Sequence, residues 1–165
     1  MIIRNTQPAD LDRVMAIYAH ARAFMAETGN PNQWGPTCWP PEALVREDIA
    51  AGRGYVCLND EGLIVGAFCY IYGKDVDPTY DVIEEGSWSS DAAYGAVHRI
   101  AAEGAKGVGS FCLNWALARS GYLRVDTHPD NRVMQNLLTK LGFEKRGIIH
   151  VVEDDYPRYA YDRVK

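Results

Sequence analysis

A glycine-rich segment in the C-terminal half of the chain has the residue types of an anion-binding turn. It runs from Glu103 to Ser110 and contains three glycines and Lys106. A strand-length apolar run, Val97–Ala102, precedes it, and an apolar segment of helical length, Phe111–Ser120, follows it. Glycines let backbone N–H groups approach a ligand, and a helix N-terminus carries partial positive charge. The pattern therefore predicts a site for a phosphate or pyrophosphate group, with Lys106 as an additional cation.

The spacing within this segment excludes two common phosphate-binding motifs. A Walker A loop needs Gly-Lys-Ser/Thr at the start of the helix, whereas this turn reads Gly107-Val108-Gly109-Ser110. The dinucleotide fingerprint G-x-G-x-x-G differs from the observed Gly104-x-x-Gly107-x-Gly109. A strand-to-helix turn that binds no ligand is the other interpretation of the segment by itself.

Length and composition limit the class of protein. The 165 residues are 47% hydrophobic and 24% charged, and they are enough for one domain that buries about two-thirds of its surface. The net charge of −5 argues against a broad nucleic-acid-binding face. We also expect no membrane span, because no apolar run approaches the ~20 residues it needs. None of the four cysteines forms a Cys-x-x-Cys pair, so we expect no metal and a reducing, cytoplasmic setting.

Periodicity and turn residues predict the elements that position this turn. Thr6 is expected to cap the first helix, and Pro41 to start the second. The expected order is β-α-α-β-β-β-α-β-α-β-β. Its strands are 1–5, 55–58, 63–72, 97–102, 122–127, 143–152 and 158–164, and its helices start near 6, 41, 111 and 132.

With this order of elements, Gly107-x-Gly109 after a strand resembles the coenzyme A pyrophosphate loop of the GNAT superfamily of N-acetyltransferases. The segment Asn131–Phe143, which reads NRVMQNLLTKLGF, is similar to a second motif of that family. The resemblance covers essentially the whole chain. It implies one acyl-CoA N-acyltransferase domain over residues 1–165. It also implies an α/β fold of the α+β type, whose mixed, mostly antiparallel sheet has about seven strands, splayed between strands 4 and 5 and flanked by about four helices.

The resemblance also implies which residues bind acetyl-CoA as a co-substrate. The pantetheine arm would run along the fourth strand, the pyrophosphate would bind the amides of the glycine-rich turn, and Asn131 would contact the coenzyme arm or cap its own helix. The implied residues are Ile100, Ala101, Ala102, Gly104, Ala105, Lys106, Gly107, Val108, Gly109, Ser110, Asn131 and Met134. Two positions depart from the family pattern, because Gly104 replaces a usual Gln or Arg and Leu138 replaces the tyrosine that usually protonates the leaving thiolate.

The implied reaction is direct acetyl transfer to a primary amine, and it needs a group that moves protons. His98 on the fourth strand is the first candidate, since histidine titrates near neutrality, and Tyr94 on the same strand face could complete a water-linked relay. A hydrogen-bonded core histidine is the alternative interpretation. Trp34, Glu85 and Trp88 lie in loops and are candidates for the acceptor site, with Glu84 and Glu85 favouring a cationic amine. Covering the hydrophobic core is the alternative role for Trp34.

The sequence leaves three matters open. A coenzyme-binding sensor of the same fold without catalysis is the main rival function, and a nucleotide-phosphate-binding domain is a weaker one. The identity of the small-molecule acceptor is open. So is the oligomeric state, although members of the family are often homodimers.

Overall fold

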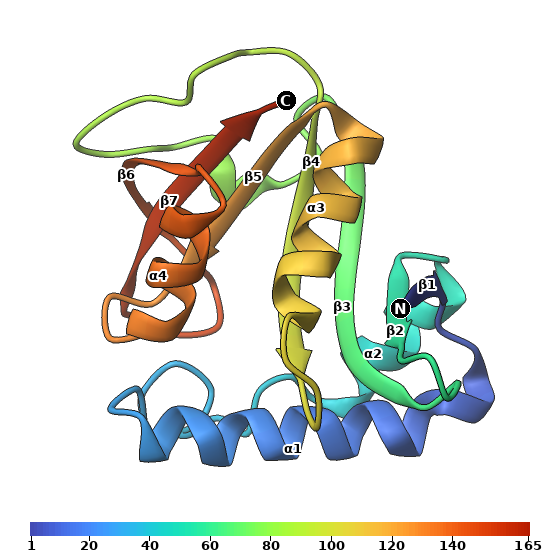
Figure 1. Cartoon of the computed structure of the whole chain (residues 1–165). Helices are drawn as coiled ribbons and strands as arrows, with labels where there is room; N and C mark the ends of the chain where they lie inside the picture. The colour runs from blue at the N-terminus through green and yellow to red at the C-terminus, as the bar shows by residue number, and fades with distance from the viewer. The chain divides into compact units, whose positions relative to one another are not determined.

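The computed structural model describes every residue from Met1 to Lys165, and its elements follow the expected order (Figure 1). The strands are β1 (Ile2–Asn5), β2 (Gly54–Leu58), β3 (Ile64–Gly73), β4 (Tyr94–Ala102), β5 (Tyr122–Thr127), β6 (Glu144–His150) and β7 (Pro157–Val164). The helices are α1 (Leu11–Glu27), α2 (Glu42–Ala50), α3 (Val108–Ser120) and α4 (Arg132–Lys140), with short 3-10 turns at Pro8–Asp10 and Pro78–Tyr80.

The seven strands are ordered β1-β2-β3-β4-β5-β7-β6 in one mixed sheet. The pairs β1–β2, β2–β3, β5–β7 and β6–β7 are antiparallel, whereas β4 and β5 are parallel. The β4–β5 register covers only Gly95 opposite Leu123 and Ala96 opposite Arg124, although both strands continue further. The predicted fold class and the interruption between strands 4 and 5 are confirmed.

The chain divides into two compact units. The first comprises Met1–Tyr70 and His98–Leu113, and the second comprises Ile71–Val97 and Asn114–Lys165. Strands β3 and β4 and helix α3 each contribute residues to both units. The expectation of a single domain over residues 1–165 stays a prediction.

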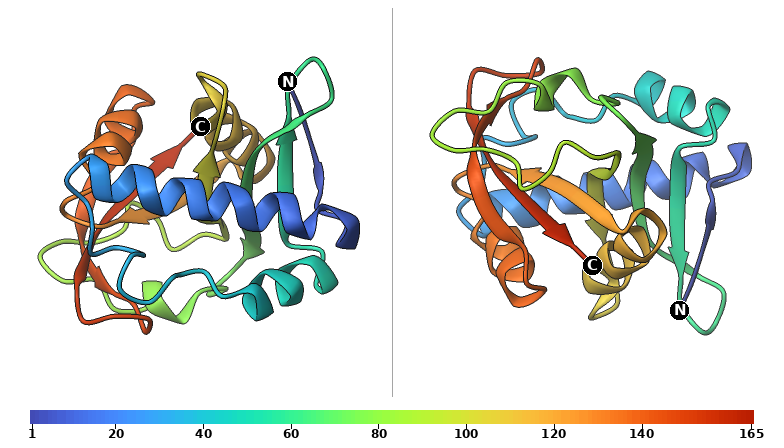
Figure 2. Two further views of the ribbon diagram at one scale, coloured as in Figure 1. Left: turned by 90° about the horizontal axis from the view of Figure 1, so that it is seen from below. Right: turned by 90° about the horizontal axis from the view of Figure 1, so that it is seen from above.

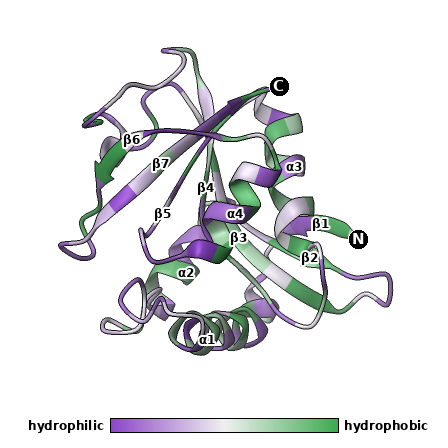
Figure 3. Cartoon of the chain, turned by 60° about the vertical axis from the view of Figure 1, so that its left-hand side comes forward, coloured by the Kyte–Doolittle hydropathy of each residue, from purple (hydrophilic) through white to green (hydrophobic).

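The core of the first unit packs against one face of α1. This helix buries Leu11, Val14, Ile17, Tyr18 and Ala21, at the three- and four-residue spacing of one helical face. They cluster with side chains from α2, β2, β3 and β4. The residues of β3 are mostly hydrophobic (Figure 3), and positions 65–70 are all buried, as expected for a central strand.

The start of the first helix differs from the prediction. Thr6 does not cap it, because Gln7 holds the N-cap position of the 3-10 turn and Asp10 that of α1. The Thr6 amide bonds to the Gly54 carbonyl at 2.9 Å and continues the strand pairing. The chain then turns through Pro8–Asp10, where the Asp10 carboxylate accepts the Gln7 amide at 2.7 Å and pairs with Arg4 at 2.7 Å. The Asp10 carboxylate therefore closes the 3-10 turn before α1, and no side chain caps the first turn of α1 itself.

The second unit is built on β5, β6, β7 and α4. Its core cluster contains Tyr80, Tyr94, Ala96, Tyr122, Ile149 and Ala160. The long connection 74–93 runs beside β6 (Figure 2), where Glu84 forms an antiparallel bridge with Ile148. A buried Asp162, which is 0% exposed, holds the same connection, because its carboxylate accepts the Ser89 amide at 2.8 Å and the Ser89 hydroxyl at 2.7 Å.

Candidate functional site: the glycine-rich turn

The glycine-rich turn adopts the conformation that an anion-binding turn requires. Gly104 and Gly107 have φ values of +79° and +82°, in the left-handed region that favours glycine. No heavy atom lies within 4 Å of where a Cβ would stand at either position. Backbone geometry is therefore the reason for glycine at both positions.

Helix α3 begins at Val108, three residues earlier than Phe111, where we predicted its start. The Phe111 amide donates to the Gly107 carbonyl at 2.9 Å. The amides of Val108, Gly109 and Ser110 therefore lie in the first turn, where no preceding helical carbonyl can accept them. The correction strengthens the anion-site interpretation, since the dipole and these amides coincide with the glycines.

Strand β3 anchors both ends of the turn within the first unit. The Glu103 amide donates to the Val65 carbonyl at 2.9 Å, and the Val108 side chain, 1% exposed, packs over Gly66. A Cβ on Gly66 would stand 2.5 Å from Val108 Cγ1 and 3.3 Å from the Ala101 carbonyl oxygen. Sequence reasoning missed Gly66 because a glycine within an apolar strand does not reveal which side chain approaches it.

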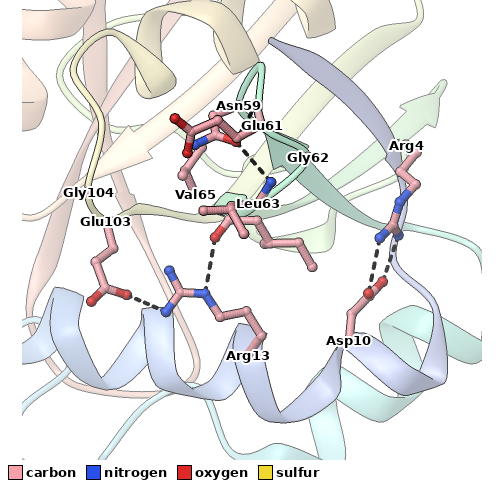
Figure 4. Close-up of a pocket in the computed structure, with 11 residues that line it drawn as sticks. Arg4, Asp10, Arg13, Asn59, Glu61, Gly62, Leu63, Val65, Glu103 and Gly104 are labelled. Carbon is pink, nitrogen blue, oxygen red and sulfur yellow. Dashed lines mark hydrogen bonds and ion pairs between the residues drawn. The ribbon is translucent and has the colours of Figure 1, made fainter.

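The charges around the turn are balanced locally. Glu103 lies at the entrance of the turn, and Arg13 of α1 donates to its carboxylate at 2.8 Å and to the Ile64 carbonyl at 3.1 Å. Figure 4 shows this pair beside Gly104 in a pocket whose other arginine, Arg4, is paired with Asp10. Lys106 is exposed at the tip of the turn. Because both arginines of the pocket hold carboxylates, the free backbone amides of the turn are the better anion site.

The implied pantetheine strand leads directly into this turn. Ile100 and Ala102 are half-buried, and Ala101 is buried among the core residues of the first unit. His98 is half-buried on the same strand and belongs to the first unit. Tyr94 belongs to the second unit, so the relay between these two residues stays a prediction.

Tyr94 is enclosed within the second unit. It is 2% exposed, and its hydroxyl oxygen accepts the Asp77 amide at 3.3 Å. Burial raises the pKa of the Tyr94 phenol, so the side chain is a neutral hydroxyl at physiological pH. A neutral phenol can donate a proton but is a poor base, which leaves His98 as the better candidate for deprotonating an amine.

The aromatic residues near Tyr94 already hold a cation. The Arg124 guanidinium carbon lies 3.9 Å from the Tyr94 ring centroid and 4.4 Å from that of Trp88. The Trp88 indole also donates to the Tyr80 carbonyl at 2.9 Å. Arg124 is itself buried, 6% exposed, so these ring faces bind an internal cation. A contact between Trp88 and an acceptor would have to use another part of the ring.

The remaining acceptor candidates are Trp34 in the first unit and Glu85 in the second. Trp34 is 6% exposed and packs edge-on against Tyr18 in the first unit, with ring centroids 5.9 Å apart. The structure therefore shows Trp34 packed into the core of the first unit, as in the alternative interpretation. A contact between Trp34 and the acceptor stays a prediction. Glu85 is exposed at a φ of +58°, and its neighbour Glu84 lies 3.4 Å from a ring nitrogen of His150.

The second family-like segment forms the start and body of α4. Asn131 caps this helix, because its side-chain oxygen accepts the Met134 amide at 3.0 Å. Met134 is half-buried, whereas Leu138 is 0% exposed. A tyrosine at position 138 would have to displace packed neighbours, so Leu138→Tyr is an overpacking change and a poor test of acid catalysis.

Comparisons with known proteins identify the family of this chain by sequence and by fold. The family model described as the acetyltransferase (GNAT) domain matches residues 1–144. A solved GNAT-family acetyltransferase from Streptococcus agalactiae is 31% identical, with a TM-score of 0.88 and coverage of 99% of this chain and 95% of that chain. No curated protein matches the chain.

Two more distant structures share the fold. A GNAT-family acetyltransferase from Listeria monocytogenes is 15% identical, with a TM-score of 0.70 and coverage of 99% of this chain and 94% of that one. Arabidopsis thaliana NAA60, solved in complex with acetyl-CoA, is 11% identical, with a TM-score of 0.64 and coverage of 99% of both chains.

The interrupted sheet and the glycine-rich turn together indicate an acyl-group transferase. The chain belongs to the GNAT acetyltransferase family. This membership confirms the resemblance deduced from Gly107-x-Gly109 and Asn131–Phe143, and it supports acetyltransferase activity. None of the helices is both long and apolar enough to cross a membrane.

Proposed function

We propose that this protein is an acetyl-CoA-dependent N-acetyltransferase that acts on the primary amine of a small acceptor. The observation that carries the proposal is the turn between β4 and α3. Its two left-handed glycines and its first helical amides supply the kind of donors that a pyrophosphate would need, in a chain that belongs to the GNAT family. Bound acetyl-CoA would supply an activated thioester.

In this proposal the residues of β4 and the turn hold the coenzyme. The backbone of Ile100–Ala102 would pair with the pantetheine arm, and the amides of Gly104–Ser110 would bind the pyrophosphate, assisted by Lys106. Asn131, which caps α4, and Met134 would contact the coenzyme arm from the start of that helix.

The protein must also manage protons. A free alkyl ammonium has a pKa of about 10, so the acceptor needs a base before it attacks. We assign that role to His98, which is half-buried and a few residues before the turn. Leucine at position 138 cannot protonate the leaving thiolate. A thiol pKa of about 8.5 makes that thiolate a tolerable leaving group, so transfer proceeds without the usual tyrosine.

The acceptor is proposed to be cationic on the basis of the exposed acidic residues Glu84 and Glu85 in the long connection. The ring faces of Trp88 and Tyr94 do not add to this proposal, because Arg124 occupies them. Replacing both glutamates with glutamine should raise the KM for the acceptor and leave the coenzyme KM unchanged. A preference for anionic or neutral acceptors would argue against a cationic one.

One observation favours a second candidate function, a coenzyme-binding sensor without catalysis. It is the aliphatic, fully buried Leu138 at the usual tyrosine position. A thiol-release assay with acetyl-CoA and a panel of mono-, di- and polyamines, amino acids and amino sugars separates the two. Thiol release that depends on an amine supports the enzyme, whereas tight acetyl-CoA binding without release for any amine supports the sensor.

A further inference from the structure

Arg99 has an unusual backbone conformation in the middle of β4. Its φ is +53°, and it is the only non-glycine residue within a helix or strand that has a positive φ. Side chains with a Cβ rarely adopt this region, and such residues persist only where the surrounding structure holds them. Arg99 lies three residues beyond Ala96, where the pairing of β4 with β5 ends, and three residues before the end of the strand.

A buried ion pair holds Arg99 in place. Its guanidinium donates to one carboxylate oxygen of Asp48 at 2.5 Å, and Arg53 donates to the other at 3.0 Å. Asp48 is 4% exposed on α2, and the Arg99 side chain is 15% exposed, whereas that of Arg53 is 41% exposed. Removing one partner of such a pair leaves a buried charge without compensation. The pair therefore ties the strained residue to α2 strongly.

The turn that follows β4 has its own anchors. The Glu103 amide donates to the Val65 carbonyl, and the Val108 side chain packs over Gly66. The hydrogen bonds of the Arg99–Asp48 pair run between these two residues and to Arg53, and neither anchor takes part in them. Loss of the pair should consequently change the backbone direction near Arg99 and leave the turn in place.

We infer that the Arg99–Asp48 pair is a positioning device for the acetyl-transfer step. It holds the left-handed backbone at Arg99 and so fixes the direction of the peptide groups between His98 and Ile100. This inference rests on the proposed function, in which the turn holds the pyrophosphate and Ile100–Ala102 hold the pantetheine arm, so that the thioester end would lie toward His98. Arg99 and Asp48 act through the backbone, and neither touches the reacting atoms.

Two double variants separate positioning from simple packing. Asp48→Asn/Arg99→Gly and Asp48→Asn/Arg99→Ala both remove the charged pair, so neither leaves a lone buried charge. Glycine adopts a positive φ without strain, whereas alanine does not. If the backbone conformation is what matters, the glycine variant keeps at least fivefold more kcat than the alanine variant. Equal kcat values for the two would overturn the inference.

Single variants give the matched comparison. Asp48→Asn should lower kcat at least tenfold and leave the Kd for acetyl-CoA, measured by calorimetry, within twofold of wild type. Arg53→Gln removes only the more exposed partner of the same carboxylate and should keep kcat within twofold. A Kd that rises in parallel with the loss of kcat would show that the pair serves coenzyme binding or general stability, and would contradict the inference.

An NMR measurement tests the positioning role without relying on kcat, which matters if acetyl transfer is slow. In amide NMR spectra, the shifts of residues 98–100 should differ between acetyl-CoA and CoA in the wild type, and this difference should disappear in Asp48→Asn. The amides of residues 104–110 should respond to both ligands in both proteins. Persistence of the acetyl-dependent difference would refute the positioning role. A wild type that binds neither ligand would instead refute the proposed function.

Discussion

Replacing Gly66 with alanine perturbs the support of the glycine-rich turn without touching the turn itself. The new Cβ would stand 2.5 Å from Val108 Cγ1 and 3.3 Å from the Ala101 carbonyl oxygen. Unstrained carbon atoms approach to about 3.5–4.0 Å, so roughly 1 Å must be relieved by movement. Val108 is 1% exposed and β-branched, so it cannot rotate away cheaply. The first residue of α3 must therefore move.

The expected magnitudes follow from overpacking. A change of this kind costs about 1–3 kcal/mol of unfolding free energy. For a chain of this size each kcal/mol lowers Tm by roughly 2–4 °C, so we expect a decrease on the order of 2–12 °C. Because the shift displaces the helix N-terminus, the Kd for acetyl-CoA should rise about tenfold, which corresponds to about 1.4 kcal/mol.

The assay consists of thermal melts and acetyl-CoA titrations of Gly66→Ala, Val108→Ala and the double variant. Val108→Ala removes the clashing methyl group, so the double variant Gly66→Ala/Val108→Ala should lose less stability than the sum of the single losses, by about 1 kcal/mol. Strict additivity, or a Gly66→Ala protein with wild-type Tm and affinity, would refute the idea that β3 positions the turn.

Three other changes test separate parts of the site. Arg13→Gln removes the arginine partner of the Glu103 carboxylate beside the turn and should weaken acetyl-CoA binding several-fold, whereas Arg46→Gln, in an exposed pair on α2, should have no effect; equal affinities would contradict this electrostatic argument. His98→Ala should lower kcat by about 10²–10⁴-fold and spare coenzyme affinity; a lower Tm with an unchanged kcat would make His98 a core residue instead. Burial would by itself raise the pKa of Asp162, but hydrogen bonds from Ser89, Arg146 and Tyr122 outweigh burial and lower that pKa below its ordinary value. Asp162 thus stabilises the fold above the unfolded-state pKa of about 3.9, and this stability is lost as pH falls through the lower folded-state pKa. Asp162→Asn should therefore cost about 3 kcal/mol at pH 7 and flatten the acid limb of stability against pH; an unchanged acid limb in urea melts would contradict it.

The fold could be predicted from the sequence because its signals are local. Apolar periodicity identified α1, α4 and the buried strand β3, and glycines and prolines marked their ends. Boundaries were less certain where two signals compete. Val108–Ser110 reads as a loop because it contains glycine and serine, yet packing of Val108 against Gly66 makes it the first turn of α3.

The site could be predicted from the sequence only where a local motif forms it. The glycine spacing indicated the turn, whereas nothing local indicates that Asp48 meets Arg99 from 51 residues away. The role of the aromatic residues also depends on distant contacts. Trp88 reads as part of a surface for a cationic acceptor, but Arg124 of β5 lies over its ring.

The central claim is that the turn between β4 and α3 binds acetyl-CoA, and a calorimetric titration of three proteins tests it most directly. The wild type should bind one equivalent, and at about 100 times Kd the ligand should add roughly 2.7 kcal/mol of stability. Gly107→Asn tolerates the left-handed conformation without adding charge and should keep most of this affinity. Gly107→Glu places a carboxylate where the pyrophosphate would bind and should abolish it. A wild type that does not bind acetyl-CoA, or a glutamate variant that binds as tightly as the asparagine variant, would contradict the account.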